Sequence, residues 1–298
     1  MLTKLIVDGV LLGAVLCMAS LGLSLSYAVF RFPNFAHGEF VTVGAYAALA
    51  GADLAGQSQR PELALPAAMV AAILAAAAVA LAADRLVLRR LLARRQGAAV
   101  IIAAFAIGLL VRNVLVLLAG PAEQDAGLPL EIATPILPGV AALSAARLTV
   151  VERAVVIAAV LLMLVLQLLL RRSRFGRDLR AVAENPDLAG ACGLVVPRLR
   201  AVAWGLTGMF CGLAGLALVL LGPVRPESGG ELLLPALAAV IVGGLGSIGG
   251  TLAGAMLIGL AESATVHLGF AEWRQVVSFL AILLVLGVRP QGLFGRAA

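Results

Sequence analysis

The sequence predicts an all-α, polytopic membrane protein with about eight transmembrane segments, two of which are broken or re-entrant. Hydrophobic residues make up 62% of the chain and charged residues only 13%, a balance unlike that of soluble globular proteins. Apolar runs long enough to cross a hydrocarbon core of ~30 Å recur along the whole chain. We therefore expect residues 1–298 to form a single transmembrane domain without a separate soluble unit.

The apolar runs place the helices in order along the chain. The expected segments lie at about 5–30, 36–56, 62–83, 98–119, 152–170, 201–221, 233–266 and 272–288. The run at 233–266 is broken at its glycines, and the run at 36–56 follows a polar stretch at 31–39. Lipid cannot satisfy free backbone N–H and C=O groups, so both interruptions must be buried in protein or face a water-filled cavity.

Charged residues cluster in the connections and orient the chain. The 84–97 connection carries five arginines against one acid, and the 171–200 connection carries seven arginines against three acids. The 120–151 connection is instead acidic, with Glu123 and Asp125 near its start. By the positive-inside rule the first two connections face the cytoplasm and the third lies outside. The net charge of +6 is thus a topology signal, which argues against nucleic acid as a partner.

The two ends of the chain leave alternatives open. Two full spans before the first basic connection place Arg31 in the cytoplasm and the N-terminus outside, although Lys4 favours the opposite side. A re-entrant first interruption returns Lys4 to the cytoplasm. Arg289 and Arg296 favour a cytoplasmic C-terminus, which requires the 233–266 segment to return to the side it entered, as a re-entrant pair does.

The first interruption, residues 31–39, brings three polar side chains together: Asn34, His37 and Glu39. A broken helix leaves backbone groups unpaired, so we expect these side chains to hydrogen-bond the freed backbone. Ionisable groups at membrane depth are also candidates for direct contact with a permeant. The spacing is not that of an H-E-x-x-H metal site, and the chain has only one other histidine, His267.

The second interruption, residues 243–250, is rich in glycine. Gly243, Gly244, Gly246 and Ser247 stand in the middle of an apolar segment in the opposite half of the chain from the first interruption. Gly/Pro-interrupted segments in both halves of a polytopic chain point to a transport path, so we expect the two breaks to face each other along it. The alternative is that the glycines only let two half-helices approach closely.

Sequence signals for an enzyme are incomplete. A serine–histidine protease would combine Ser247 with His267, but Leu245 occupies the position of the first glycine in a G-x-S-x-G elbow. The P-loop pattern G-x-x-x-x-G-K-[ST] does not occur, so the chain is not expected to bind ATP itself. We therefore expect a non-catalytic transport subunit.

Small residues predict how one helix packs. Gly205, Gly208, Gly212 and Gly215 recur within 201–221 at steps of three, four and three, which keeps them on one helical face. Helices in lipid associate through such residues because their backbones approach closely. Each glycine costs about 1 kcal/mol of helix propensity relative to alanine, so packing must offset that cost. We expect a tight helix contact here, with a substrate path along the glycines as the alternative.

The 171–200 connection is more structured than a tether. Its sequence predicts a short helix, a turn at Asn185 and Pro186, a second short helix and a stop. A folded, charged loop on the cytoplasmic side is suited to docking a soluble partner. The alternative is a plain positive-inside anchor.

Four stretches together resemble the permease subunits of bacterial ATP-binding-cassette importers for branched-chain amino acids. Residues 34–46 open with Asn-Phe-Ala-His-Gly-Glu-Phe and end with Gly-Ala-Tyr, and residues 175–185 open with Phe-Gly-Arg and end with Arg-Ala-Val-Ala-Glu-Asn. The glycine-rich 243–250 stretch and Arg-Pro-Gln-Gly-Leu-Phe-Gly at 289–295 complete the match. The likeness covers nearly the whole chain and is closer to the shorter, H-type permease of the high-affinity leucine, isoleucine and valine system.

The resemblance implies a multi-pass protein of the bacterial inner membrane that works in a complex. The implied partners are a second permease subunit, two cytoplasmic ATPases and a periplasmic amino-acid-binding protein, besides membrane lipid. No cofactor is implied in this chain, because the ATPase subunits bind ATP and magnesium. The 171–200 loop would hold the coupling helix that sits in an ATPase groove, formed around Arg177, Ala183, Glu184, Asp187 and Gly193.

Two other functions stand as alternatives. Permeases for urea and short amides share the same motifs, so the resemblance leaves the substrate open between these and branched-chain amino acids. An ion-driven secondary transporter would need buried carboxylates as proton or cation relays. Asp8, Glu39 and Glu262 are the candidates, and none has a partner that is visible in the sequence.

Overall fold

The computed structural model describes residues 2–57, 61–93, 97–125, 134–135, 147–289 and 291–294. Parts of the 84–97 and 120–151 connections lie outside the described residues, as do Pro290, Gly295 and Arg296 near the C-terminus.

The described chain is helical almost throughout, and its long helices begin and end within a few residues of the expected ranges. They are α1 (Leu2–Phe30), α2 (His37–Gln57), α3 (Ala64–Ala83), α4 (Arg89–Ala93), α5 (Gly97–Ala119), α7 (Val150–Arg172), α8 (Arg174–Glu184), α9 (Pro186–Ala191), α10 (Val196–Leu221), α11 (Ser228–Gly243), α12 (Ile248–His267) and α13 (Arg274–Val288). A π-helical turn at Asp84–Leu88 joins α3 to α4. Strands β1 (Thr134–Pro135) and β2 (Arg147–Leu148) form one short antiparallel ladder. The all-α polytopic fold class is confirmed.

Seven of the described helices are long and apolar enough to cross a membrane, so the expected count of eight is not confirmed. They are α1, α3 together with its continuation through α4, α5, α7, α10, α12, and α13 together with the 3-10 turn Ala271–Trp273 that precedes it. The helix missing from the expected set is α2, which carries the buried polar residues His37, Glu39 and Thr42. The 16-residue α11 is too short to count, and it pairs with α12 across the glycine-rich break.

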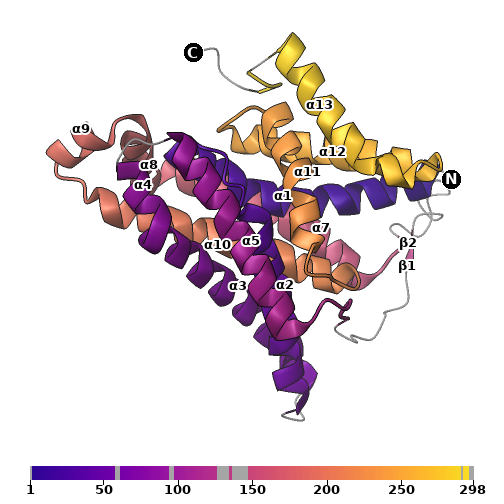
Figure 1. The fold of residues 1–298 in the computed structure, drawn as a ribbon. Helices are drawn as coiled ribbons and strands as arrows, with labels where there is room; N and C mark the ends of the chain where they lie inside the picture. The colour runs from indigo at the N-terminus through magenta and orange to yellow at the C-terminus, as the bar shows by residue number, and fades with distance from the viewer. Residues whose placement is uncertain are drawn as a thin grey trace.

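Helices α1 and α10 are the most buried of the long helices, whereas α5 lies against α2, and α13 lies against α11 and α12 (Figure 1). In the most apolar stretch of α1 and of α10, 61% of residues are buried, against 17% in α5 and 6% in α13. Helix α1 runs antiparallel to α12, and a β-carbon on Gly9 or Gly13 would press on Leu260 or Met256. Small residues thus set this contact, as expected for helices in lipid.

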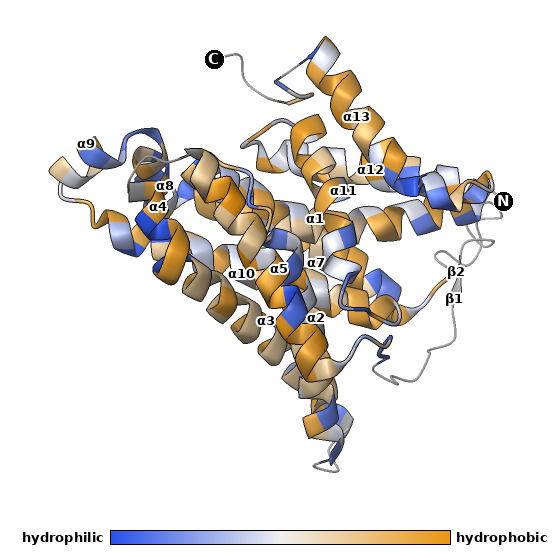
Figure 2. Ribbon diagram, in the orientation of Figure 1, coloured by the Kyte–Doolittle hydropathy of each residue, from blue (hydrophilic) through white to orange (hydrophobic). Residues whose placement is uncertain are grey.

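Hydrophilic residues gather near two opposite ends of the helices (Figure 2). At one end lie α4, α8 and α9, from the two arginine-rich connections, so the positive-inside rule makes this end cytoplasmic (Figure 1). The start of α1 lies at the other end beside the end of α12, because the Ser263 hydroxyl donates to the Leu5 carbonyl (2.8 Å) and His267 lies 3.4 Å from Asp8. With the cytoplasmic end assigned by this rule, the start of α1 lies on the external side, as in the first of the two open alternatives.

The α11–α12 pair returns to the side it entered, as the cytoplasmic C-terminus required. Just before α11, Val224 pairs with Gln124 beyond the end of α5, with N···O distances of 2.8 and 2.9 Å. Helix α12 ends beside the start of α1 at the same, external side. The turn between the two helices therefore points toward the cytoplasmic half of the molecule.

Three of the four glycines predicted to form a packing face of α10 lie directly against a neighbouring helix. A β-carbon on Gly208 or Gly212 would collide with the backbone of α3, and one on Gly215 would collide with the backbone of α2. Gly205 corrects the prediction, because nothing lies within 4 Å of the position that its β-carbon would occupy. The backbone of α3 does not approach it, although it shares the helical face.

Candidate functional site

The α11–α12 break is a tight turn held by its own backbone. The Ser247 N–H donates to the Gly244 carbonyl (2.9 Å), and the Ser247 hydroxyl caps α12 by accepting from the Gly250 N–H (3.2 Å). Gly244 and Gly246 have φ values of 102° and 82°, which favour glycine. Gly243 and Gly250 abut so closely that a β-carbon on either would collide with the carbonyl of the other. Close approach of two helix ends is therefore one role of these glycines.

The C-terminal segment satisfies the open end of α11. The Leu293 N–H donates to the Val242 carbonyl (2.8 Å), and the Phe294 N–H donates to the Gly243 carbonyl (3.2 Å). The last carbonyls of a helix have no intrahelical partner, and lipid could not supply one. Two motifs that are distant in the sequence are thus joined in one structural unit.

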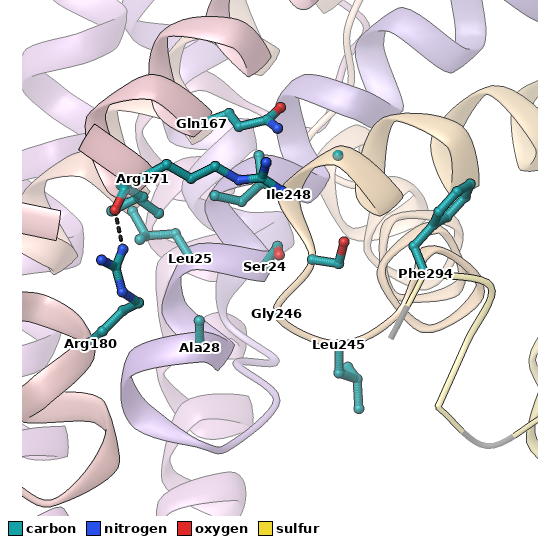
Figure 3. Close-up of a pocket in the computed structure, with 13 residues that line it drawn as sticks. Ser24, Leu25, Ala28, Gln167, Arg171, Arg180, Leu245, Gly246, Ile248 and Phe294 are labelled. Atoms are coloured by element: carbon teal, nitrogen blue, oxygen red, sulfur yellow. Dashed lines mark hydrogen bonds between the residues drawn. The ribbon is translucent and has the colours of Figure 1, made fainter. Parts of the chain in front are cut away.

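A cavity of about 770 Å³ opens beside this turn (Figure 3). Residues from α1, α7, α8, the turn and the C-terminal segment line it. Its polar side chains come from Ser24, Gln167, Arg171, Arg180 and Ser247. Because Arg171 lies at the end of α7 and Arg180 on α8, the cavity belongs to the cytoplasmic half of the molecule.

The charge of this cavity is positive. Its charged lining residues are Arg171 and Arg180, and no acidic side chain lines it in the described part of the chain. The Arg180 guanidinium donates to the Leu170 carbonyl at the end of α7. The Arg171 side chain instead extends across the cavity toward Ile248, the first residue of α12 (Figure 3). The N-terminal end of α12 adds the partial positive charge of its helix dipole.

The first interruption is buried and packed. Phe30 stacks on Trp204 with ring centroids 4.8 Å apart, and the Phe32 ring lies 6.5 Å from the same indole. Asn34 is 1% exposed, and its Oδ1 accepts from the Ala36 N–H (3.1 Å). Asn34 therefore satisfies freed backbone, as expected for a helix broken at membrane depth.

His37 joins three helices. Its Nε2 lies 2.8 Å from the Ala19 carbonyl in α1 and donates to it, since a carbonyl oxygen can only accept. Nδ1 is then the acceptor nitrogen, and the Cys211 sulfur on α10 lies 3.5 Å from it. The imidazole, 1% exposed, thereby fixes the start of α2 against α1 and α10.

Glu39 makes an ion pair that was not predicted from the sequence. Arg112 Nη2 on α5 lies 2.6 Å from Glu39 Oε1, with the two side chains 32% and 8% exposed. Gly230, near the start of α11, lies directly against both groups. The available signal was Arg112 itself, a lone charge in an apolar helix, since such charges at membrane depth are usually paired.

The cavity beside the α11–α12 turn is lined by the second interruption and, among the described residues, not by the first. Gly246 and Ser247 line this cavity together with Leu245, whereas Gly243 and Gly244, which precede Leu245 in the chain, are not among its lining residues. Within the described residues, Asn34, His37 and Glu39 do not line this cavity. His37 and Glu39 contact neighbouring helices, and Asn34 accepts from the Ala36 N–H.

The residues that a serine–histidine protease or an ion-driven transporter would need are far apart or already paired with other residues. Ser247 and His267 stand at opposite ends of the 20-residue α12, about 30 Å apart at 1.5 Å per residue, so they cannot act as a catalytic pair. The three carboxylates considered as ion relays all have partners, in the pairs Asp8–His267, Glu39–Arg112 and Glu262–Ser278.

The 171–200 connection has the predicted helix–turn–helix form. The Ser173 hydroxyl caps α8, and Asn185 Oδ1 caps α9 by accepting from the N–H groups of Asp187 (3.1 Å) and Leu188 (3.0 Å). Pro186 fits the first position of α9, where no backbone donor is needed. Of the residues assigned to the coupling loop, Ala183 is half-buried and the others are exposed, namely Arg177, Glu184, Asp187 and Gly193.

Known proteins resemble this chain over nearly its whole length. A sequence model of the family described as "branched-chain amino acid transport system / permease component" matches residues 5–286. The chain is 29% identical over 291 residues to the high-affinity branched-chain amino acid transport system permease protein LivH of Escherichia coli (strain K12), covering 97% of this chain and 94% of that protein. It is 31% identical over 303 residues to the probable branched-chain amino acid transport permease protein LivH of Methanocaldococcus jannaschii, covering 98% and 92%. A stretch of 127 residues is 31% identical to the fructose import permease protein FrcC of Rhizobium meliloti, covering 40% and 35%.

Proposed function

The chain belongs to the permease-component family of branched-chain amino acid transport systems, and on this basis we propose that it forms the membrane path of an ATP-driven importer for branched-chain amino acids. It is a multi-pass membrane protein, and permeases of this family lie in the bacterial inner membrane. The observation that carries the proposal is the cavity beside the α11–α12 turn. Non-helical backbone at membrane depth, lining a polar opening, is the form that substrate sites take in transporters built from broken helices.

The proposed importer contains further chains. A second permease subunit pairs with this one, two ATPase subunits bind ATP and magnesium on the cytoplasmic side, and a periplasmic protein delivers the amino acid. This chain performs no covalent chemistry; it supplies the path and the surface through which the ATPases act on it. The apolar, exposed faces of α5 and α13 face lipid or the second permease.

Branched-chain amino acids are the favoured substrates over urea, short amides and sugars. The relatives that align over more than nine-tenths of their length are named for branched-chain amino acids, whereas the fructose permease aligns over 35% of its length. Uptake of labelled leucine by cells that depend on this chain tests the choice. Excess valine or isoleucine should compete, while excess urea, acetamide or fructose should not.

Coupling to the ATPases runs through α8 and α9 in this proposal. Both helices are capped, and α8 is fixed to the end of α7, since Arg180 donates to the Leu170 carbonyl. Leu188 and Val195 are 62% and 59% exposed beside charged residues, which suits an apolar contact with a polar rim.

Reversing the charges of Glu184 and Asp187 to lysine should uncouple ATP hydrolysis from uptake. Reversing charges at a docking surface removes its charge complementarity and weakens binding of the ATPase subunit. We therefore expect uptake to fall at least about tenfold while the chain still inserts. Uptake and ATPase activity of the reconstituted complex measure this. The control is lysine in place of Glu62, which is exposed and lies just before the start of α3, at the end of that helix away from α4. This variant should leave uptake unchanged. Equal uptake by the two variants would exclude docking at α8 and α9.

A further inference from the structure

We propose that the start of α12, Arg171 and the Ser24 hydroxyl form a subsite for a carboxylate, the anionic group of an α-amino acid. The subsite lies in the cavity beside the α11–α12 turn. The inference rests on the proposed function for the identity of the permeant, and it adds which chemical group the cavity recognises.

The first component is the N-terminal end of α12. A helix leaves its first backbone N–H groups without intrahelical acceptors, and the aligned peptide dipoles attract an anion there. The Ser247 hydroxyl accepts from the Gly250 N–H, which leaves the N–H groups of the residues between them as donors. Both of those residues, Ile248 and Gly249, line the cavity. Gly249 has no side chain to cover the backbone, so an anion can approach closely.

The second component is a buried hydroxyl that has no partner. Ser24 on α1 is 0% exposed, lines the cavity, and its Oγ makes no hydrogen bond within the described residues. An unsatisfied buried hydroxyl destabilises the folded protein, so such a group usually has a ligand or water as its partner. Ser24 thus adds a hydroxyl without a described partner to the α1 wall of the same cavity (Figure 3).

The third component is Arg171. Its side chain is exposed, extends across the cavity toward Ile248, and has no ion-pair partner among the described residues (Figure 3). The other lining arginine, Arg180, is already held by the Leu170 carbonyl. With no acidic lining residue to neutralise it, Arg171 supplies the full positive charge that a carboxylate needs and that a neutral urea, amide or sugar does not.

The test measures the charge preference of the cavity with a reporter thiol. Ala28→Cys introduces a half-exposed thiol in the lining, in a Cys192→Ser background that removes the exposed native thiol; Cys17 and Cys211 are buried. Inside-out vesicles carrying the complete transporter are treated with an anionic (sulfonatoethyl) or a cationic (trimethylammonioethyl) methanethiosulfonate. Arg171→Gln should lower the ratio of anionic to cationic labelling rates about tenfold. Arg172→Gln, the adjacent arginine that does not line the cavity, should leave it unchanged.

Ligand protection identifies the group that is recognised. In the reporter protein, 4-methylpentanoate should slow labelling at millimolar concentration, whereas the isosteric but neutral 4-methylpentanamide should not. Arg171→Gln and Ser24→Ala should each remove the protection, and Arg172→Gln should retain it. Equal protection by acid and amide, or an equal effect of Gln at 171 and 172, would overturn the proposal.

Leucine uptake by cells that depend on this chain separates the carboxylate subsite from the proposed function. Protection by 4-methylpentanoate without leucine uptake would leave the carboxylate subsite standing and exclude branched-chain amino acids as the permeant. Leucine uptake without protection by either compound would support the function and overturn the subsite.

Discussion

Alanine in place of Gly212 is expected to lower the free energy of unfolding of this chain by about 1–3 kcal/mol, the usual effect of overpacking a tight contact. A β-carbon there would collide with the Ala72 carbonyl and the adjoining backbone of α3. Backbone cannot move aside as a flexible side chain can, so α10 and α3 must separate. Leucine at the same position should prevent recovery of folded protein. Thermal unfolding of the purified protein and the yield of monodisperse material measure both effects.

Gly205→Ala is the matched control on the same helix and the same face. Its β-carbon would meet nothing within 4 Å, so only the helix propensity changes. That change favours alanine by up to about 1 kcal/mol, and stability should be unchanged or slightly raised. Equal destabilisation by G205A and G212A would show that the glycines are not distinguished by packing against α3.

Removing either member of the Glu39–Arg112 pair alone should be similarly damaging. Breaking a buried ion pair leaves an uncompensated charge and costs about 3–5 kcal/mol. Arg112 is 32% exposed, so solvent screens part of this loss and we expect the lower end, about 3 kcal/mol, for Arg112→Ala or Glu39→Ala.

The double variant Glu39→Ala/Arg112→Ala is the control for this pair, because it removes both charges together. Its loss of stability should be smaller than the sum of the single losses by about 2 kcal/mol, as residues in direct contact are not additive. Additive losses would mean that the two side chains act independently and that α2 and α5 are held together by other contacts.

Much of the fold follows from local patterns in the sequence. Apolar runs gave the long helices to within a few residues, and cap residues such as Asn185 gave the turn between α8 and α9, because both are decided by near neighbours. The glycine-rich break was predicted for the same reason. The span count differed because α2 combines helical length with buried polar residues, and such a helix is stabilised by its neighbours.

The candidate site depended on contacts that no local pattern contains. The sequence did not show that Ser24, Arg171 and Phe294 would surround Ser247, since they come from three distant segments. Nor did it show that His37 would pair with Ala19. Gly205 has the same helical spacing as Gly208, Gly212 and Gly215. A packing contact also requires the backbone of a second helix, and no such backbone lies beside Gly205 in the folded protein.

The most direct test of the central claim is leucine uptake by proteoliposomes that contain this chain with its sister permease, the ATPase subunits and the binding protein. We expect uptake to require ATP inside with the ATPases, and to stop when the ATPases are withheld or replaced by variants that cannot hydrolyse ATP. An imposed proton or sodium gradient should not restore it, because the carboxylates available as ion relays are already paired. Uptake driven by such a gradient in the absence of the ATPases would show that this chain is not the permease of an ATP-driven importer.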